Sequence, residues 1–188
     1  MVLFILGLIV FFGIHHTRQL VSGVRDNAIA RFGLQGWKGI YALLSFAGIA
    51  LMVIGWMQWR VDAPDVYIQP DWGHYVTELL VLIAFVLLSA SSTPTGYIKQ
   101  WVVHPMLIGI ILWSVGHLFA NGDLASVLLW GVFALSSIWH IIAAEMRHDP
   151  HPRSKGWQGD VGAVAIGVIF YFVFGYWLHG LLFGVSPF

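Results

Sequence analysis

Several of the nine histidines stand inside or at the edge of long apolar stretches, where an imidazole is the most reactive group present. Such a ring can form a structural hydrogen bond, relay a proton, or ligate a metal or a haem iron. The chain has no cysteine, which excludes thiolate ligation, iron–sulfur clusters and disulfides and leaves histidine as the strongest nitrogen ligand. For one ring alone the structural role is the simplest interpretation. Several rings on different helices favour a shared ligand.

The stretch from His104 to Asp123 contains two of these rings, His104 and His117, at the ends of an apolar run. Pro105 suits the first turn of a helix, and Asn121-Gly122-Asp123 is a turn sequence that would end it. Helical geometry separates the two rings by about 20 Å along the axis and turns them roughly 140° apart. One ligand cannot be held by both. Whatever His117 binds must therefore be completed by another helix.

The other candidate rings come from other apolar segments. His15 lies in the last third of the first segment, His74 opens the third with Glu78 one helical turn later, and His140 lies near the end of the fifth. An apolar, aromatic interior with imidazoles on several helices suits a flat hydrophobic macrocycle with iron ligated on one or both sides. A bare zinc site is disfavoured because no H-E-x-x-H cluster occurs. Two rings that ligate one iron from opposite sides must lie at nearly the same depth in the membrane. Counted along the helices, the pairs that meet this requirement more easily are His74 with His117 and His15 with His104.

Composition assigns the chain to the integral membrane proteins. Of its 188 residues, 59% are hydrophobic and only 10% are charged, too few polar residues to cover a soluble globule. Six apolar segments approach the ~20 residues needed to cross the hydrocarbon core. We predict an all-α fold, a polytopic transmembrane bundle of about six helices that forms a single domain over residues 1–188. The segments lie near 2–20, 36–58, 74–92, 102–120, 124–146 and 160–184.

The charged residues predict how the bundle is oriented. If successive segments cross the membrane in opposite directions, eight of the nine Lys and Arg residues fall on one side of the membrane and only Arg60 falls on the other. The positive-inside rule makes the basic side cytoplasmic and places both termini outside. The opposite loops carry Asp62, Asp65, Asp71 and Asp123. The basic residues thus serve topology, and no nucleic-acid partner is expected.

Smaller features indicate packing and interfacial elements. Gly48 and Gly55 stand seven residues apart, as do Gly109 and Gly116, so each pair offers a flat seam for close helix contact. The basic connection 21–38 suits either a helix lying along the anionic inner leaflet or a solvated loop. His179, near the outer end of the last segment, is expected at the membrane interface.

Three stretches resemble the NnrU family of bacterial membrane proteins. They are FFGIHH (Phe11–His16), GWKGIY (Gly36–Tyr41) and, most specifically, HPMLIGIILWSVGHLFANGDLAS beginning at His104. The resemblance covers nearly the whole chain. The family is named for its association with nitrite and nitric oxide reductase expression in denitrifying bacteria. It is similar to the plant 15-cis-zeta-carotene isomerase, a plastid membrane enzyme that uses haem b.

The resemblance implies non-covalent haem b, with His15 and His117 as axial ligands and His104 as a further motif histidine. His104 or His74 would be the replacement partners. In the isomerase a cysteine stands three residues before the second ligand histidine, and here that position is Ser114, which is no comparable iron ligand. The expected partners are the lipid bilayer, haem, and a lipophilic polyene or nitric oxide.

From these observations we favour a haem-binding accessory protein or sensor for nitrite and nitric oxide reduction. It would lie in the bacterial inner (cytoplasmic) membrane as a multi-pass protein with periplasmic termini. The alternative is a haem-dependent cis–trans isomerase of a carotenoid-like or isoprenoid-like polyene. A small transporter would require internal repeats or broken polar helices, and the sequence has neither clearly. No catalytic residue is assigned, and the oligomeric state is left open.

Overall fold

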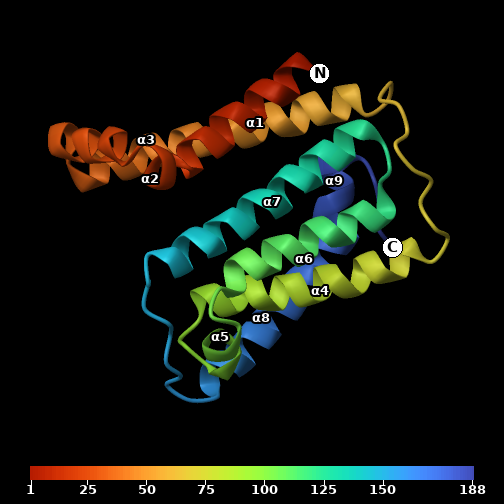
Figure 1. The fold of residues 1–188 in the computed structure, drawn as a ribbon. Helices are drawn as coiled ribbons and strands as arrows, with labels where there is room; N and C mark the ends of the chain where they lie inside the picture. Colours follow the sequence, from red (N-terminus) through yellow and green to blue (C-terminus); the bar gives the residue numbers. More distant parts are fainter. The chain divides into compact units, whose positions relative to one another are not determined.

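The computed structural model describes residues 1–188, and helices make up most of the chain (Figure 1). The only β pairing is one isolated bridge between Asp65 and Asp123, so the predicted all-α class is confirmed. In chain order the helices are α1 (Val2–His15), α2 (Thr17–Leu20), α3 (Ser22–Trp59), α4 (Gly73–Ser92), α5 (Tyr97–Val102), α6 (Pro105–Ala120), α7 (Leu124–Met146), α8 (Gln158–Val173), the π-helical turn η1 (Phe174–Leu178) and α9 (His179–Phe183).

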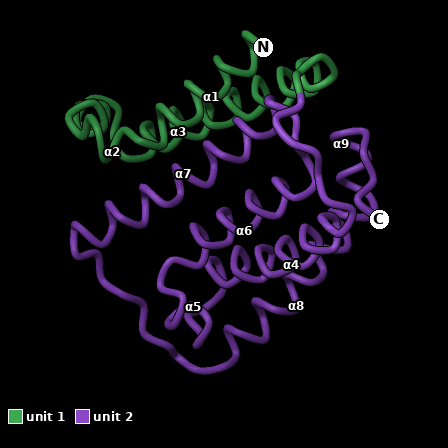
Figure 2. Tube along the Cα trace, turned by 45° about the vertical axis from the view of Figure 1, so that its right-hand side comes forward, with its two compact units in different colours: residues 1–64 green, residues 65–188 purple.

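The helices form two compact units, which Figure 2 distinguishes by colour. Unit 1 comprises Met1–Pro64 and holds α1 to α3, whereas unit 2 comprises Asp65–Phe188 and holds the remaining helices. The prediction of a single domain over 1–188 stays a prediction.

All six predicted apolar segments are helical, and four of the helices are long and apolar enough to cross a membrane. These are α3, α4, α7 and the continuous stretch from α8 to α9. The apolar helices α1 and α6 are shorter, with 14 and 16 residues. In α6 the reason is local, because Pro105 disfavours a helical conformation at the residue before it and Val103 has a positive φ of 63°. The helix therefore begins at Pro105 with His104 as its N-cap residue.

In unit 1, α1 packs along α3 through the predicted glycine seam. A Cβ at Gly55 would lie 2.2 Å from the amide nitrogen of Phe4, and one at Gly48 would lie 2.8 Å from that of Phe11. Both distances are below any normal contact, so only glycine lets the two backbones approach this closely. Phe4 is completely buried in the contact. The expected role of Gly48 and Gly55 is confirmed.

The connection before the second apolar segment is helical rather than a loop. The helix α3 already begins at Ser22, but Gly33 within it has a φ of 71° and a ψ of 170°, which breaks the helix into two arms. Glycine adopts this backbone conformation without a Cβ penalty, which explains a kink at this residue. The helical interpretation of the 21–38 connection is thus confirmed. Its place along the inner leaflet stays a prediction.

In unit 2, α4 and α6 form the central pair, with α8 against α4 and α7 against α6 (Figure 1). The second glycine seam lies between the central helices. A Cβ at Gly109 would lie 3.1 Å from the carbonyl oxygen of Ala84, and one at Gly116 would lie 3.3 Å from the Cβ of Leu80. These contacts are tight but not impossible for alanine, so this seam is looser than the one in unit 1.

One end of unit 2 gathers the basic connections. The Asp160 carboxylate at the start of α8 accepts hydrogen bonds of 2.9 Å from the amides of Tyr97 and Ile98. The amide of Lys155 donates to the carbonyl of Thr95 at 2.8 Å. The segments 93–104 and 147–157 therefore lie together, as the alternation of charge predicted. They carry four basic residues: Lys99, Arg147, Arg153 and Lys155.

The opposite end of unit 2 gathers acidic connections. The amide of Val66 donates to the carbonyl of Gly122 at 2.8 Å, and the Tyr67 hydroxyl donates to the carbonyl of Asn121 at 2.8 Å. Asp123 caps α7 by accepting a hydrogen bond from the Ser126 amide at 2.9 Å. The 121–123 turn thus ends α6 and starts α7, as its sequence predicted.

Candidate functional site

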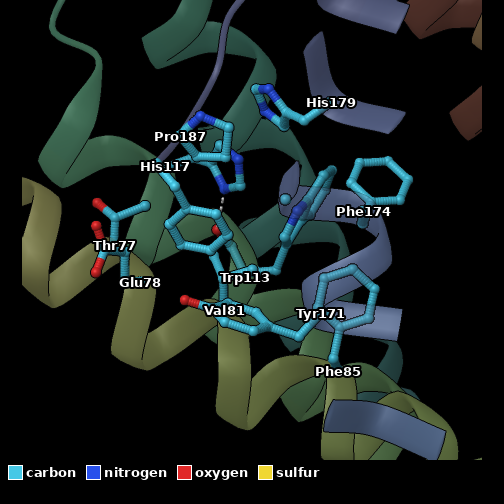
Figure 3. A pocket seen from close by; sticks show the side chains of 12 residues that line it. Thr77, Glu78, Val81, Phe85, Trp113, His117, Tyr171, Phe174, His179 and Pro187 are labelled. Carbon is cyan, nitrogen blue, oxygen red and sulfur yellow. Dashed lines mark hydrogen bonds between the residues drawn. The ribbon is translucent and has the colours of Figure 1, made fainter. Parts of the chain in front are cut away.

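The candidate site is a pocket in unit 2 at the end that carries the acidic connections (Figure 3). Its cavity volume is about 60 Å³. Side chains from α4, α6, α8, η1, α9 and the 184–188 segment form its walls. The lining residues are Thr77, Glu78, Val81, Phe85, Trp113, His117, Tyr171, Phe174, Gly175, His179, Pro187 and Phe188. The walls are thus mainly aromatic, with two imidazoles and one side-chain carboxyl group among them.

His117, a residue predicted from the sequence, is one of the two imidazoles. Its Nδ1 lies 2.8 Å from the carbonyl oxygen of Trp113. A carbonyl can only accept, so Nδ1 carries the proton and Nε2 keeps the lone pair in the neutral ring. The Trp130 ring packs against the imidazole with a centroid distance of 4.2 Å. The ring is therefore held in one orientation, with Nε2 as the atom available to a ligand.

His179, which the sequence placed only at the membrane interface, is the second imidazole of the pocket. Its Nδ1 lies 2.7 Å from the carbonyl oxygen of Val185, so its Nε2 also keeps the lone pair. The ring lies beside that of His117, with centroids 6.5 Å apart and planes 19° from parallel (Figure 3). The π-helical turn Phe174–Leu178 immediately precedes it. Such turns recur at functional sites because they change the direction in which the following residues point.

The polar groups on α4 complete the pocket. The Thr77 hydroxyl donates to the Gly116 carbonyl at 2.7 Å and so joins α4 to α6 at the residue before His117. Glu78 is half-buried and lines the pocket, and it forms no hydrogen bond with His74, although their spacing would allow one. His74 is exposed, lies against Tyr75 at 3.8 Å between ring centroids, and stands outside the pocket. Its role as a replacement ligand stays a prediction.

His104 lies at the other end of α6, as the spacing predicted. Its Nε2 lies 2.7 Å from Oε1 of Glu145, at the end of α7. His151 shares the same carboxylate, with its Nε2 3.2 Å from both oxygens. His104 is thus part of a His–Glu–His cluster among the basic connections and does not line the pocket. Ligation of haem by His104 stays a prediction.

His15 belongs to unit 1. Its Nδ1 lies 2.7 Å from the carbonyl oxygen of Phe11, and its ring stacks on the Phe11 ring at 4.1 Å between centroids. The ring of Tyr41 on α3 approaches it to 5.0 Å. Because His117 belongs to unit 2, the pairing of His15 with His117 stays a prediction.

Two further residues of this region are of interest. Tyr171 on α8 is buried in the pocket wall and was missed from the sequence, because one tyrosine among many aromatic residues carries no distinguishing signal. Ser114, at the position of the isomerase cysteine, is completely buried, and its Oγ has no hydrogen-bond partner. It does not line the pocket.

The donors and walls of the pocket suit a haem, whereas the cavity volume is too small to hold one without rearrangement. Two imidazoles with protonated, anchored Nδ1 atoms are suitable iron ligands, and the aromatic walls suit a porphyrin. Pockets for organic cofactors enclose roughly 300–1,000 Å³, far more than the about 60 Å³ of this cavity. Pro187 and Phe188 are the wall residues that no helix holds. No group of three or more His, Cys, Asp or Glu side chains is placed to hold a bare metal ion.

The apolar helices and this pocket define a helical membrane protein with a histidine-bearing aromatic site. The family model described as NnrU protein matches residues 3–187, and the chain belongs to this family. No curated protein and no solved structure matches it significantly.

Proposed function

We propose that the chain binds b-type haem non-covalently in the pocket of unit 2, where His117 would ligate the iron. The observation that carries this proposal is the His117 ring, fixed by the Trp113 carbonyl and by Trp130, with its Nε2 available inside an aromatic wall. A hydrogen bond from Nδ1–H to a carbonyl raises the basicity of Nε2 and so strengthens it as a metal ligand. Bound haem would supply an iron that accepts one electron and binds a diatomic ligand.

The chain's own residues would position that group and exclude water from it. Phe85 and Phe174 contact each other with ring centroids 5.9 Å apart and would offer a flat apolar surface to a macrocycle. Glu78 is the one side-chain carboxyl group in the wall, and a half-buried carboxyl at this position can hydrogen-bond a polar ligand or hold a proton near it.

For the biological role we propose an accessory protein or sensor of nitrite and nitric oxide reduction in the bacterial inner membrane. Membership of the NnrU family supports this role, and the gathering of basic connections at one end of unit 2 supports periplasmic termini. Reporter fusions at residue 188 and after Arg31 should report opposite compartments. If both report the same compartment, the topology is wrong.

A haem-dependent polyene isomerase is the second candidate, and the aromatic walls favour it because they would accept a hydrophobic substrate. Ser114 argues against it. The side chain is buried away from the pocket, and a hydroxyl is a poor iron ligand in any case. The accessory role therefore stands first.

The test is an absorption spectrum of the full chain purified in detergent from haem-replete cells. The wild type should show a Soret band, and His117→Ala should lose most of it. His140→Ala is the matched control, because this α7 ring has the same type of Nδ1 bond, 2.8 Å to the carbonyl of Ser136, but lies outside the pocket. A colourless wild type, or equal loss in both variants, would contradict haem binding at His117.

The same preparation separates the two functions. Binding of nitric oxide to the ferrous protein without conversion of a cis-polyene would leave the accessory role standing alone. Turnover of the polyene, dependent on His117, would instead establish the isomerase.

A further inference from the structure

We propose that the first arm of α3 with its N-cap, residues 21–32, lies flat on the membrane surface at the basic side and binds acidic phospholipids through Arg25 and Arg31. This inference goes beyond the proposed function, because it concerns unit 1 alone and needs no haem. It assigns a partner to a helix face that unit 1 leaves uncovered.

The arm begins where a membrane-spanning helix ends. Gly33 breaks α3, and the arm turns away from the line of the rest of the helix there (Figure 2). The apolar part after the break, residues 34–59, spans roughly 39 Å at 1.5 Å per residue, more than the ~30 Å of the hydrocarbon core. Gly33 therefore stands at the boundary of the bilayer. A helix that turns away at this point runs along the membrane surface.

One face of the arm is apolar and exposed. At 100° per residue, four of its residues fall within about 80° of one another around the helix. They are Val21, Val24, Ala28 and Phe32. Apart from Ala28, each is more than half exposed. The opposite face carries small and polar residues, namely Ser22, Gly23, Asp26, Asn27 and Ala30. An exposed apolar stripe opposite a polar face is typical of a helix that lies in the membrane interface.

Two arginines flank the apolar face. By the same geometry, Arg25 and Arg31 lie about 20° beyond its two edges. Arg25 pairs with the neighbouring Asp26 at 3.1 Å, which neutralises part of its charge. Arg31 has no acidic partner, and its guanidinium carbon lies 5.3 Å from the centroid of the Phe32 ring. Arginines in these positions reach the headgroup phosphates while the stripe between them enters the acyl boundary.

The charge of this face selects the kind of lipid. Each basic side chain near an acidic membrane surface strengthens binding about fivefold. Arg31 should contribute this full effect because no carboxylate competes for it, whereas Arg25 should contribute less because it already pairs with Asp26. The face therefore fits a leaflet that contains acidic phospholipids.

The depth of the arm can be measured with spin labels, because the chain has no cysteine and a single introduced one is labelled without background. Ala28→Cys places the label in the middle of the apolar face, and the matched variant Ala30→Cys places it on the opposite face. The full chain is inserted into nanodiscs of phosphatidylcholine mixed with phosphatidylglycerol. The label at residue 28 should collide mainly with oxygen, which concentrates in lipid. The label at residue 30 should collide mainly with a water-soluble nickel complex.

The charge requirement is tested in the Ala28→Cys protein. Arg31→Gln should lower the ratio of docked to undocked arm, read from the two components of the spectrum, about fivefold. Nanodiscs of phosphatidylcholine alone should lower it at least as much. Arg31→Lys keeps the charge and should keep the arm docked. Arg60→Gln is the matched control and should also keep it docked, because Arg60 stacks on a ring in the same way, 4.4 Å from the Trp56 centroid, at the other end of α3.

Three results would overturn the proposal. Equal collision with nickel at residues 28 and 30 would mean that the arm stands in water. A label at residue 28 that is shielded from both oxygen and nickel would mean that a protein, such as a second copy of the chain, covers the face. Docking that is unchanged in Arg31→Gln and in phosphatidylcholine alone would mean that acidic lipids are not the partner.

Discussion

Replacing Gly55 by alanine should loosen the pairing of α1 with α3. A Cβ at this position would lie 2.2 Å from the amide nitrogen of Phe4 and 2.6 Å from its Cα, whereas ordinary contacts begin at 3.4 Å. Both neighbours are backbone atoms, so no side chain can rotate away and the helices must separate by about 1 Å, which weakens every contact between them. Overpacking of this kind costs roughly 1–3 kcal/mol. Replacing a helical glycine by alanine offsets about 0.5–1 kcal/mol of that. With the middle value of each range, the net loss in unfolding free energy should be about 1 kcal/mol.

Gly39 in the same helix is the matched control, because no atom other than its chain neighbours and the backbone of its own helix lies within 4 Å of the place that a Cβ would take there. Gly39→Ala should therefore stabilise the protein by about 0.5–1 kcal/mol through helix propensity alone. Denaturant unfolding in detergent micelles, followed by tryptophan fluorescence, measures both changes. The two variants should shift the midpoint in opposite directions. If Gly55→Ala were as stable as Gly39→Ala, the close approach of α1 to α3 would be wrong.

Three further predictions concern unit 2. Asp160→Asn should cost about 1.5–3 kcal/mol by weakening charge-assisted bonds to the first amides of α5, and hydrogen exchange of those amides should accelerate. Asp123→Ala should cost about 1 kcal/mol by removing the cap of α7, and Asp123→Ser should recover most of it in a thermal unfolding assay. Burial, and then the Asp123 carboxylate, raise the pKa of Tyr67 above its usual value of 10. The neutral phenol therefore contributes its full stability below pH 10, and this contribution is lost as pH rises through the raised pKa. Tyr67→Phe has no phenol to ionise, so its unfolding free energy should fall less in alkali than that of the wild type.

Much of the helical framework followed from local patterns in the sequence. Apolar runs of near-spanning length predicted the helices, Pro105 predicted where α6 begins, and the glycine pairs predicted which faces make close contact. The alternation of basic and acidic connections predicted which loops of unit 2 lie together. Each of these features depends on residues close together in sequence or on a count along the chain, and such features can be read without a structure.

The site could be predicted only in part. The pattern around His117 identified one wall residue of the pocket. The position of His179, however, depends on a π-turn between Phe174 and Leu178, which no periodic pattern in the sequence predicts. The same holds for the carboxylate of Glu145, whose partner His104 is 41 residues away. A one-residue change in helical register redirects every later side chain by about 100°. Sequence spacing therefore could not show which face His179 occupies.

The short length of α6 has a consequence for the lipid around the protein. Its 16 residues span about 24 Å, less than the ~30 Å of a typical hydrocarbon core, while the neighbouring α7 has 23 residues and spans about 35 Å. Such hydrophobic mismatch within one pair of helices is relieved when the bilayer becomes locally thinner or when water enters the membrane beside the shorter helix. The His104–Glu145 pair at one end of α6 would then stand in a hydrated depression, and the protein should be most stable in membranes with short acyl chains.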